Sequence, residues 1–363
     1  MRKVLHVVAD GAPGGGTTAV LGLCQDLVRS GWRAALVTQT DSYGFQTSRT
    51  LGVEAHGLDF FRSRADPAVP RNLAAVINAV APNVVHVHGS RAGHAFCSPR
   101  LRRLKVPMVY TVHGYHFLKK ALPLRILGWV AERRIGGRAD HMVFVSKNDQ
   151  KIARHWGLVR TASEATTVIY NGIDPVELDA VARPSATYDL AFVGRMHTQK
   201  NPRFAVDVMA ALAGDGVRLL LVGGGELEAE VRGYAVARGV ADRITFTGAL
   251  GRREALGALA SARVYLFPSL WEGLPIGPME AMYYGLPIVA SRVGGTDEVV
   301  ADGATGFLID DFDPVRYAGA VRRLLRDDVL HAAMAAAGRR RVESLFLRTA
   351  STAGYRALYE RVS

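Results

Sequence analysis

Short apolar runs alternate with amphipathic segments along most of this 363-residue chain. In the first half, runs rich in Val, Leu and Ile have the length of buried strands, and segments with apolar residues three or four positions apart predict helices between them. The predicted strands are Lys3–Ala9, Ala34–Thr38, Val84–His88 and Met108–Val112, and the predicted helices are Thr18–Arg29, Asn72–Val80 and Leu124–Arg134. Such alternation is typical of a parallel sheet with helices on both faces.

The same alternation starts again in the second half. The predicted strands are Asp189–Val193, Arg218–Val222, Ile244–Thr247, Val264–Pro268 and Pro287–Ser291, and the predicted helices are Pro202–Ala213, Leu227–Arg238, Arg253–Ala260 and Pro278–Tyr284. The turn-rich stretch Asn171–Ala186 separates the halves. We therefore expect an α/β fold of two doubly wound, Rossmann-like domains, residues 1–182 and 183–345. A final helix, Val342–Arg361, is expected to let residues 346–363 pack back on the first domain.

The composition is that of a folded globular protein, with 49% apolar and 21% charged residues. No apolar run approaches the roughly 18 residues that span a bilayer, and the first ten residues are interpreted as a strand and not a signal peptide. The two cysteines, Cys24 and Cys97, form neither a disulfide framework nor a zinc set. We therefore expect a cytoplasmic protein.

Positive charge is concentrated in the first half of the chain. Residues 1–180 hold 23 Lys and Arg against 13 Asp and Glu, a net charge of +10, out of +12 for the whole chain. Ten basic residues and one acid, Glu132, lie within 100–138. No recognisable nucleic-acid-binding module accompanies this charge, so no nucleic-acid partner is predicted.

Glu272 and Glu280 bracket a Gly- and Pro-rich loop, with seven residues between them. The loop follows a predicted strand, and Pro278 suits the first position of a helix, with Gly277 as its N-cap and Glu280 in its first turn. Free N–H groups at a helix start bind anions, whereas separate carboxylates suit hydroxyl groups. A helix-dipole complement or a solvated loop would explain either glutamate alone. The pair favours a site for a polyhydroxylated ligand that carries phosphate.

Three further loops follow predicted strands, at the edge where open parallel sheets bind ligands. Gly14–Gly16 lets a ligand approach the backbone, although it is neither a Walker A loop nor a strict GxGxxG motif. Arg195 can fork across two phosphate oxygens and Lys200 can add a point charge, the ordinary alternative being two solvated cations. Gly223–Gly225 is either a wall of a nucleotide site or an ordinary turn.

His88 and His113 each lie at the end of an apolar strand. A histidine satisfied within the fold is the usual explanation for either residue, and the strand-end position favours a functional role for His113 in particular. Neither histidine forms a spaced metal-ligand set with nearby residues, and no Gly-x-Ser-x-Gly nucleophile elbow is present. No metal site is predicted.

Several of these segments resemble the retaining GT-B glycosyltransferases of family 4, also called group 1, over nearly the whole chain. The matching segments are Gly14–Gly16, Thr111–Gly114, Val168–Asp174, Gly194–Arg195 with Lys200–Pro202, Glu272–Glu280, Gly294–Val300 and Asp302–Phe307. The Gly-Arg loop followed by the Glu-x7-Glu segment is a specific combination. The resemblance implies the GT-B fold, in which an N-terminal acceptor domain and a C-terminal nucleotide-sugar domain face each other across a cleft.

The resemblance also implies roles for the matching residues. The candidate catalytic residues are Arg195, Lys200, Glu272 and His113, and the candidate donor-binding residues are Gly15, Gly16, Gly224, Thr247, Gly248, Leu250, Gly273, Leu274, Pro275, Ile276 and Glu280. Arg195 and Lys200 would neutralise the departing diphosphate, and Glu272 would hold the transferred sugar. Glu280 would hold the ribose, and His113 would lie near the reacting face of the sugar.

The implied reaction is transfer of a hexosyl or N-acetylhexosaminyl group from a nucleotide diphosphate sugar, with a UDP-sugar favoured. Retention is expected, with the leaving phosphate oxygen taking the proton of the acceptor, and neither a metal nor a cofactor besides the donor is expected. An inverting enzyme would instead need a general base near the acceptor hydroxyl, for which His113 is the first candidate.

The segment Tyr115–Val130 combines cations with apolar and aromatic residues. Its candidate acceptor or membrane residues are His116, Phe117, Lys119, Lys120 and Arg125. Such a segment suits an anionic membrane surface and a lipid-linked acceptor, and it resembles family members that assemble capsular or extracellular polysaccharide. An ordinary active-site helix with snorkelling lysines explains it equally well. We expect a glycan or lipid-linked acceptor, with the protein cytoplasmic or peripheral on the cytoplasmic face of the membrane.

Three alternatives stay open at this point. The acceptor could be a soluble small molecule, or the chain could be a sugar-nucleotide 2-epimerase, which an acceptor-free assay would reveal. A non-catalytic sensor of sugar nucleotides would keep the same site without turnover.

Overall fold

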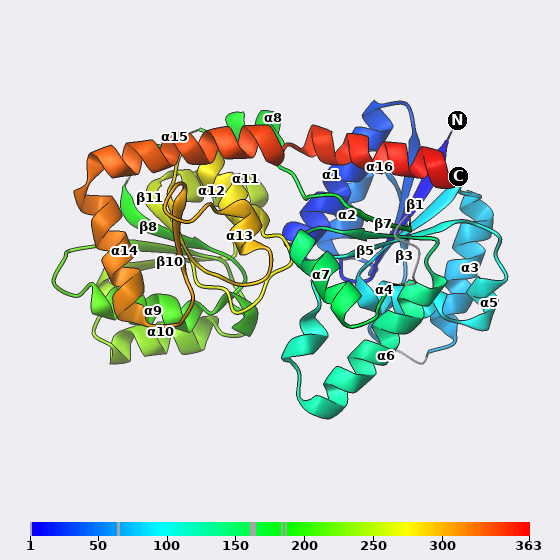
Figure 1. Cartoon of the computed structure of the whole chain (residues 1–363), viewed down its shortest axis with the longest axis horizontal. Helices are drawn as coiled ribbons and strands as arrows, with labels where there is room; N and C mark the ends of the chain where they lie inside the picture. Colours follow the sequence, from blue (N-terminus) through cyan, green and yellow to red (C-terminus); the bar gives the residue numbers. More distant parts are fainter. Residues whose placement is uncertain (1, 64–65, 160–164, 183, 186) are drawn as a thin grey trace. The chain divides into compact units, whose positions relative to one another are not determined.

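The computed structural model describes residues 2–63, 66–159, 165–182, 184–185 and 187–363 (Figure 1). The chain divides into two compact units: unit 1 comprises Met1–Gly172 and Arg348–Ser363, and unit 2 comprises Ile173–Leu347. Each unit contains one sheet of parallel strands, which confirms the predicted fold class. Within the described ranges, no helix is long and apolar enough to cross a membrane.

Unit 1 is built on a seven-stranded parallel sheet with the order β3-β2-β1-β4-β5-β6-β7. Its strands are β1 Lys3–Val8, β2 Arg33–Thr38, β3 Glu54–Gly57, β4 Val84–His88, β5 Met108–Val112, β6 His141–Phe144 and β7 Thr166–Val168. β4 and β5 have the predicted bounds. β3, β6 and β7 were not predicted, because they are short strands and two of them, the edge strands β3 and β7, are not buried.

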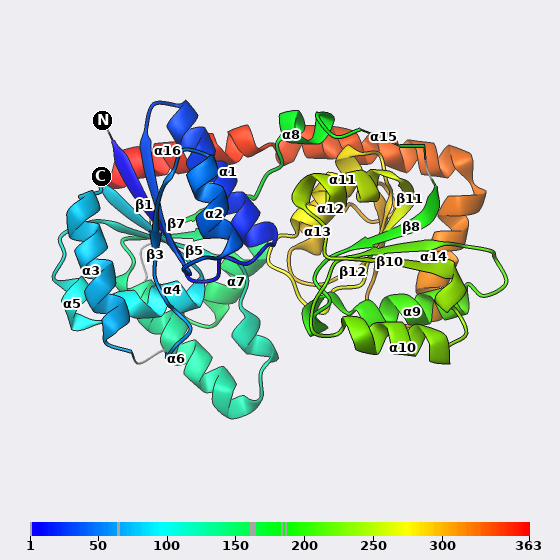
Figure 2. The same ribbon diagram turned by 180° about the vertical axis from the view of Figure 1, so that it is seen from behind.

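Helices cover both faces of this sheet (Figures 1 and 2). The helices of unit 1 are α1 Gly15–Arg29, α2 Tyr43–Thr50, α3 Ala68–Val80, α4 Gly89–Phe96, α5 Pro99–Arg102, α6 Leu122–Arg138, α7 Lys147–His155 and α16 Arg348–Val362. Apolar residues of α3, α4 and α6 pack on one face, and those of α1 and α16 pack on the other. The C-terminal α16 is fixed to α1 by the Arg348 guanidinium, which donates two 2.9 Å hydrogen bonds to Asp26.

The expected helix Val342–Arg361 is two helices, α15 (Asp328–Leu345) and α16. The break lies at Phe346 and Leu347. The carbonyl of Phe346 accepts a 2.8 Å hydrogen bond from the Ile173 amide, and Leu347 forms a β-bridge with the same residue. The Phe346 side chain is fully buried. The chain leaves the helix here because these long-range contacts take the place of helical hydrogen bonds.

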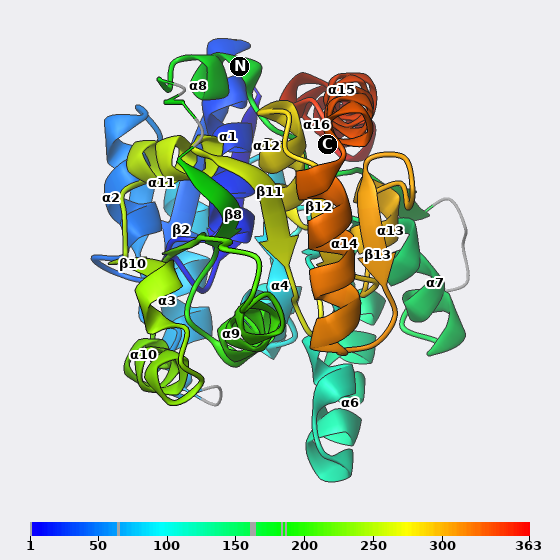
Figure 3. The same ribbon diagram turned by 90° about the vertical axis from the view of Figure 1, so that its left-hand side faces the viewer.

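Unit 2 is built on a six-stranded parallel sheet with the order β10-β9-β8-β11-β12-β13. The strands are β8 Tyr188–Val193, β9 Leu219–Val222, β10 Ile244–Gly248, β11 Ala262–Phe267, β12 Ile288–Ser291 and β13 Gly306–Ile309. The other helices are α8 Pro175–Asp179, α9 Pro202–Ala211, α10 Glu228–Ala237, α11 Arg252–Ala260, α12 Ile276–Tyr283, α13 Thr296–Val299 and α14 Pro314–Arg326. Figure 3 shows α9, α10 and α14 on one side of the strands and α11 and α12 on the other.

Unit 1 ends at Gly172, whereas we expected the boundary after residue 182. The reason is that α8 packs on unit 2. The Tyr283 hydroxyl donates to Asp179 at 2.8 Å, and the Tyr284 hydroxyl donates to the Leu178 carbonyl at 3.0 Å. Part of the expected linker is therefore a helix of unit 2, and its residues 183 and 186 lie outside the described residues.

Candidate active site

Each sheet has one point at which the order of its strands reverses. This switch point lies between β1 and β4 in unit 1, and between β8 and β11 in unit 2. Ligands of open parallel sheets bind beyond the carboxyl ends of the strands at such points. The candidate loops Gly14–Gly16, Arg195–Lys200 and Glu272–Glu280 follow β1, β8 and β11, so every one of them follows a strand that flanks a switch point.

Lys200 and Glu272 join the two loops at the switch point of unit 2. Lys200 Nζ lies 2.6 Å from Glu272 Oε1, and the Glu272 side chain is only 8% exposed. Backbone contacts hold the loops in the same place, since the Leu270 amide donates to the Gln199 carbonyl at 2.8 Å. The structure thus brings together two candidate residues that are 72 positions apart, and it pairs them with each other.

Arg195 does not take part in this ion pair. Its side chain is exposed, and among the described residues no carboxylate lies within salt-bridge distance of it. Its carbonyl accepts a 2.8 Å hydrogen bond from the His197 amide, which turns the loop away from β8. The guanidinium is therefore open to a ligand from solvent.

Helix α12 begins at Ile276 with Pro275 as its N-cap, and not at Pro278 with Gly277 as its N-cap. Pro278 is tolerated in the third helical position, because the amides of the first turn have no partner within the helix. Glu280 consequently lies in the second turn, and not in the first turn as we expected, and its side chain is buried. Gly273, Leu274, Pro275 and Ile276 are buried as well.

The partner of Glu280 is Arg252, a residue that was not predicted from the sequence. Arg252 Nη1 lies 2.6 Å from Glu280 Oε1, and the same guanidinium donates two 3.0 Å hydrogen bonds to Glu177. Burial raises the pKa of Glu280, and the charge of Arg252 opposes that shift. Burial also disfavours the charged form of Arg252, but the carboxylates of Glu280 and Glu177 favour that form. The pKa of Arg252 is raised as a result. Its position in the sequence could have identified it, because Arg252 is the first residue of α11 and follows the end of β10 closely.

Glycines allow close backbone approach around these loops. Gly294, with φ +54°, lies so close to the Glu272 carbonyl that a Cβ would collide with it, and the Gly295 amide donates to the Gly273 carbonyl at 2.9 Å. A Cβ at Gly223, whose φ is +131°, would likewise collide with the Gly194 carbonyl. Gly294 and Gly295, which lie in a segment that resembles family 4, therefore support the loop of Glu272.

The turn Gly223–Gly225 lies beside the end of β10. The Met196 amide donates to the Gly224 carbonyl at 2.9 Å, and the Gly223 amide donates to the Gly248 carbonyl at 2.9 Å. The candidate residues at the end of this strand and beyond it, Thr247, Gly248 and Leu250, are half-buried or exposed. Gly224 and residues 247–250 therefore form one wall beside the loop of Arg195 and Lys200.

The candidates of unit 1 lie at the carboxyl ends of its strands. Gly15 and Gly16 open α1 and are exposed. A Cβ at Gly16 would meet no atom within 4 Å, so packing does not require glycine there. His113 follows β5 and is half-buried, with its Nε2 3.2 Å from His88 Nδ1. Burial lowers the pKa of His113 to about 4, so its imidazole is neutral at pH 7.

Only some side chains of the basic segment 115–130 are exposed. His116, Lys119 and Lys120 are exposed, Arg125 is half-buried, and the first turns of α6 expose Leu122, Leu124, Ile126 and Leu127 at 53–64%. Phe117, however, is 7% exposed and belongs to the core, so it is not part of an exposed membrane-facing surface, and its contact with an acceptor stays a prediction. The reason is Gly128 of α6, which leaves room for the Phe117 ring to pack against the helix.

Two families match this chain, one for each half. The family described as Glycosyltransferase Family 4 matches residues 13–177, and the family described as Glycosyl transferases group 1 matches residues 177–341. The matches meet within α8, close to the boundary between the two units.

Curated relatives of this chain are also named as glycosyltransferases. The D-inositol 3-phosphate glycosyltransferase of Acidothermus cellulolyticus is 30% identical over 62% of this chain and 55% of its own length. The D-inositol 3-phosphate glycosyltransferase of Streptomyces avermitilis is 26% identical over 96% of this chain and 83% of its own length. The chain thus spans little more than half of the first relative and most of the second.

A solved structure shares the fold. HepE of Anabaena, solved in complex with UDP-glucose, superposes with a TM-score of 0.83 over 99% of this chain and 100% of its own, at 18% identity. At this identity the likeness concerns the fold, and it extends over both units.

Proposed function

We propose that this chain is a group 1 glycosyltransferase, as the two family matches support, and that it transfers a sugar from a UDP-sugar to an acceptor hydroxyl, with retention of the anomeric configuration and without a metal ion. The observation that carries the proposal is the Lys200–Glu272 contact of 2.6 Å at the switch point of unit 2. It sets a cation that suits phosphate beside a carboxylate that suits hydroxyl groups, in a loop that ends in a helix start.

The donor is held by unit 2. Glu272 accepts hydrogen bonds from the sugar hydroxyls, the amides at the start of α12 face its phosphates, and Glu280 accepts from the ribose. Arg252 keeps Glu280 ionised for this purpose. A UDP-sugar is favoured because HepE, which shares the fold, was solved with UDP-glucose.

The leaving group is stabilised by positive charge from the chain itself. Cleavage of the anomeric C–O bond places negative charge on the diphosphate, and preorganised cations at that position lower the barrier. Lys200 is already held in place by Glu272, and the exposed Arg195 joins it when the diphosphate binds. These two cations supply the charge for which other transferases use a metal.

The acceptor is held by unit 1, and we propose a glycan or a lipid-linked acceptor at an anionic membrane surface, in the assembly of cell-surface polysaccharide. The exposed leucines of α6, next to Lys119 and Lys120, support a membrane-facing segment. A soluble phosphorylated acceptor is the second candidate, because both curated relatives are named for D-inositol 3-phosphate.

A thermal-shift panel of UDP-, GDP- and ADP-sugars tests the donor. Donor present at 100 times its Kd stabilises the folded protein by about 2.7 kcal/mol. For a unit of this size, that raises Tm by about 5–10 °C. A UDP-sugar should give this shift, and GDP- and ADP-sugars should give less. Equal shifts for all three bases would contradict the preference for UDP.

Product analysis tests the reaction. Purified protein with a UDP-sugar and either lipid-linked or phosphorylated soluble acceptors should release UDP and form a glycoside, whose anomeric configuration is compared with that of the donor by NMR. An inverted product would refute retention. Formation of an epimer without acceptor would indicate an epimerase, and binding without turnover would indicate a sensor.

A further inference from the structure

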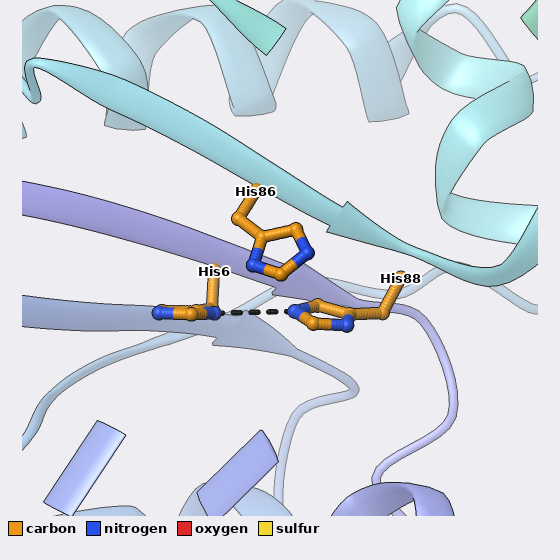
Figure 4. Close-up of side chains that lie close together, drawn as sticks. All are labelled: His6, His86 and His88. Carbon is orange, nitrogen blue, oxygen red and sulfur yellow. Dashed lines mark hydrogen bonds between the residues drawn. The ribbon is translucent and has the colours of Figure 1, made fainter. Parts of the chain in front are cut away.

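Four histidines gather on one face of the sheet in unit 1, at its switch point. His6 lies on β1, His86 and His88 lie on β4, and His113 follows β5. In the register of β1 and β4, His6 is opposite His86, and Val8 is opposite His88. Figure 4 shows the rings of His6, His86 and His88 side by side, with a hydrogen bond between His6 and His88. His6, His86 and His88 are buried.

Three of these rings form a chain of hydrogen bonds. His6 Nδ1 lies 3.1 Å from His88 Nε2, and His88 Nδ1 lies 3.2 Å from His113 Nε2. Both ring nitrogens of His88 are therefore used within the chain. His113 is its outer end, because it is the half-buried member, and His6 is its inner end.

His86 is not a link in this chain. Its Nδ1 lies 2.6 Å from the Tyr359 hydroxyl, and its Nε2 lies 2.6 Å from Thr111 Oγ1. Its ring packs on that of His88, with the centroids 3.9 Å apart. His86 thus fixes the plane of the His88 ring by packing, while its own nitrogens bind elsewhere.

All three rings of the chain are neutral at pH 7. Burial lowers the pKa of His6 to about 3 and that of His113 to about 4, and it lowers the pKa of His88 well below its usual range. A neutral imidazole has one N–H and one bare nitrogen. The N–H groups of a chain of such rings must all point the same way, either inward from His113 to His6 or outward from His6 to His113.

The inner end of the chain decides this direction. His6 Nε2 is buried and has no hydrogen-bond partner among the described residues. If the N–H groups pointed inward, this nitrogen would carry a proton that nothing accepts. If they point outward, it is a bare acceptor. Buried backbone N–H groups without a partner are rarer in proteins than backbone carbonyls without one, and the same preference applied to the ring nitrogen of His6 favours the outward direction.

We propose that His88 donates its Nδ1–H to Nε2 of His113 and so fixes His113 in the form that carries its proton on Nδ1. His88 is then a positioning residue, and His6 completes it by donating Nδ1–H to His88 Nε2. The physical basis is that the hydrogen bond made by one nitrogen of a neutral imidazole determines whether the other nitrogen carries the proton.

This assignment rests on the proposed function and sharpens it. With Nε2 occupied by His88, the nitrogen that His113 offers to a ligand is Nδ1–H, which is a hydrogen-bond donor and not a base. His113 therefore donates to an oxygen of the bound sugar or acceptor and does not take the proton of the acceptor hydroxyl. A donor at this position is compatible with retention, whereas inversion would need a base.

A metal ion is the competing explanation, because nitrogens of His6, His86 and His88 all lie within 4.8 Å of one another. The geometry favours the hydrogen-bond chain. Both nitrogens of His86 already have hydroxyl partners at 2.6 Å, so His86 would have to give up one of these hydrogen bonds to bind a metal ion. Metal analysis of the purified protein is included in the test for this reason.

The direct experiment reads the protonated nitrogens by NMR. The full-length protein is labelled with ¹⁵N in its histidine rings, and two-bond proton–nitrogen correlations are recorded at pH 7.5, with His113→Asn to assign the signals. We expect His113 to carry its proton on Nδ1. A proton on Nε2 would overturn the proposal. No substrate is needed, so this result is independent of whether the protein transfers a sugar.

Variants of His88 test the consequence for the reaction. His88→Leu removes the donor and should lower kcat roughly 10- to 100-fold, the range known for metal-ligating histidines that lose the partner that orients them. His88→Asn places an amide N–H near the position of Nδ1 and should restore most of that loss.

His141→Leu is the matched control for these variants. His141→Leu removes another buried histidine of the same sheet, which lies 2.8 Å from Thr167 Oγ1 outside the chain, and should leave the His113 signals unchanged. Thermal unfolding of each variant checks that it is folded. Unchanged His113 signals and kcat in His88→Leu would overturn the proposal. One bound metal ion per chain, lost in both His6→Leu and His88→Leu, would replace it by a metal site.

Discussion

Replacing Arg252 by Met is expected to destabilise unit 2 in a pH-dependent way. The substitution keeps the length of the side chain but leaves Glu280 without its partner at 2.6 Å, and the Glu280 side chain is only 8% exposed. Removing one member of a buried ion pair costs about 3–5 kcal/mol, because the other charge stays buried. We therefore expect the free energy of unfolding at pH 7.5 to fall by about 3–5 kcal/mol.

Protonation of Glu280 relieves part of this loss at lower pH. Burial already raises the pKa of Glu280 while Arg252 opposes that shift, so the pKa rises further in Arg252→Met. A carboxyl whose pKa is raised in the folded state stabilises it fully below the unfolded value, about 4.3, and less as pH rises. At about 1.4 kcal/mol per pH unit, lowering the pH from 7.5 to 5.0 should recover up to about 3 kcal/mol.

Hydrogen exchange of the β11 and β12 amides measures this free energy within unit 2, because these strands are buried and adjoin the site. Arg232→Met is the matched control: it breaks an exposed pair, Arg232–Glu228, and should cost under about 0.5 kcal/mol at both pH values. Glu280→Gln added to Arg252→Met should abolish the pH dependence. A loss below about 1 kcal/mol at pH 7.5, or the same loss at pH 5.0, would refute the reasoning.

Charged side chains outside the Arg252–Glu280 pair give three further predictions. Lys200→Ala should lower kcat by about 10²–10³-fold through the lost charge at the diphosphate, whereas Arg203→Ala, in the exposed pair with Glu230, should not; unchanged kcat would remove Lys200 from this role. Burial raises the pKa of Glu132 to about 7, so ionisation of Glu132 should cost the wild-type protein about 3 kcal/mol of stability between pH 4.5 and 8. Urea denaturation should show that Glu132→Gln lacks this decrease. Neutralising Lys119, Lys120 and Arg125 should abolish salt-sensitive binding to anionic vesicles in sedimentation assays, and indifference to lipid charge would argue against membrane contact.

Much of the fold could be predicted because its pattern is local. β4 and β5 were predicted with their observed bounds, since each is a run of apolar residues buried on both faces. The half-exposed edge strands β3 and β7 were missed, because strands without a buried pattern carry no such signal. The start of α12 was misplaced, because Pro278 fits the third helical position as well as the first.

The candidate site was predicted in part for the same reason. Strand-exit loops with Arg195, Lys200, Glu272 and the glycines are visible in the sequence, because ligand sites of parallel sheets lie at strand ends. Arg252 was missed, because its importance depends on Glu280, which reaches it only when α11 and α12 pack side by side.

The sequence alone determined that this chain has two parallel α/β units with glycine-rich and charged loops at their strand ends, and its motifs resemble those of the family 4 glycosyltransferases. Tertiary structure alone decided which charges pair and which histidines connect. His6 and His88 are 82 positions apart, and Lys200 and Glu272 are 72 apart. The physical reason is that ion pairs and imidazole tautomers depend on contacts within a few ångströms, and only the pairing of distant strands creates those contacts.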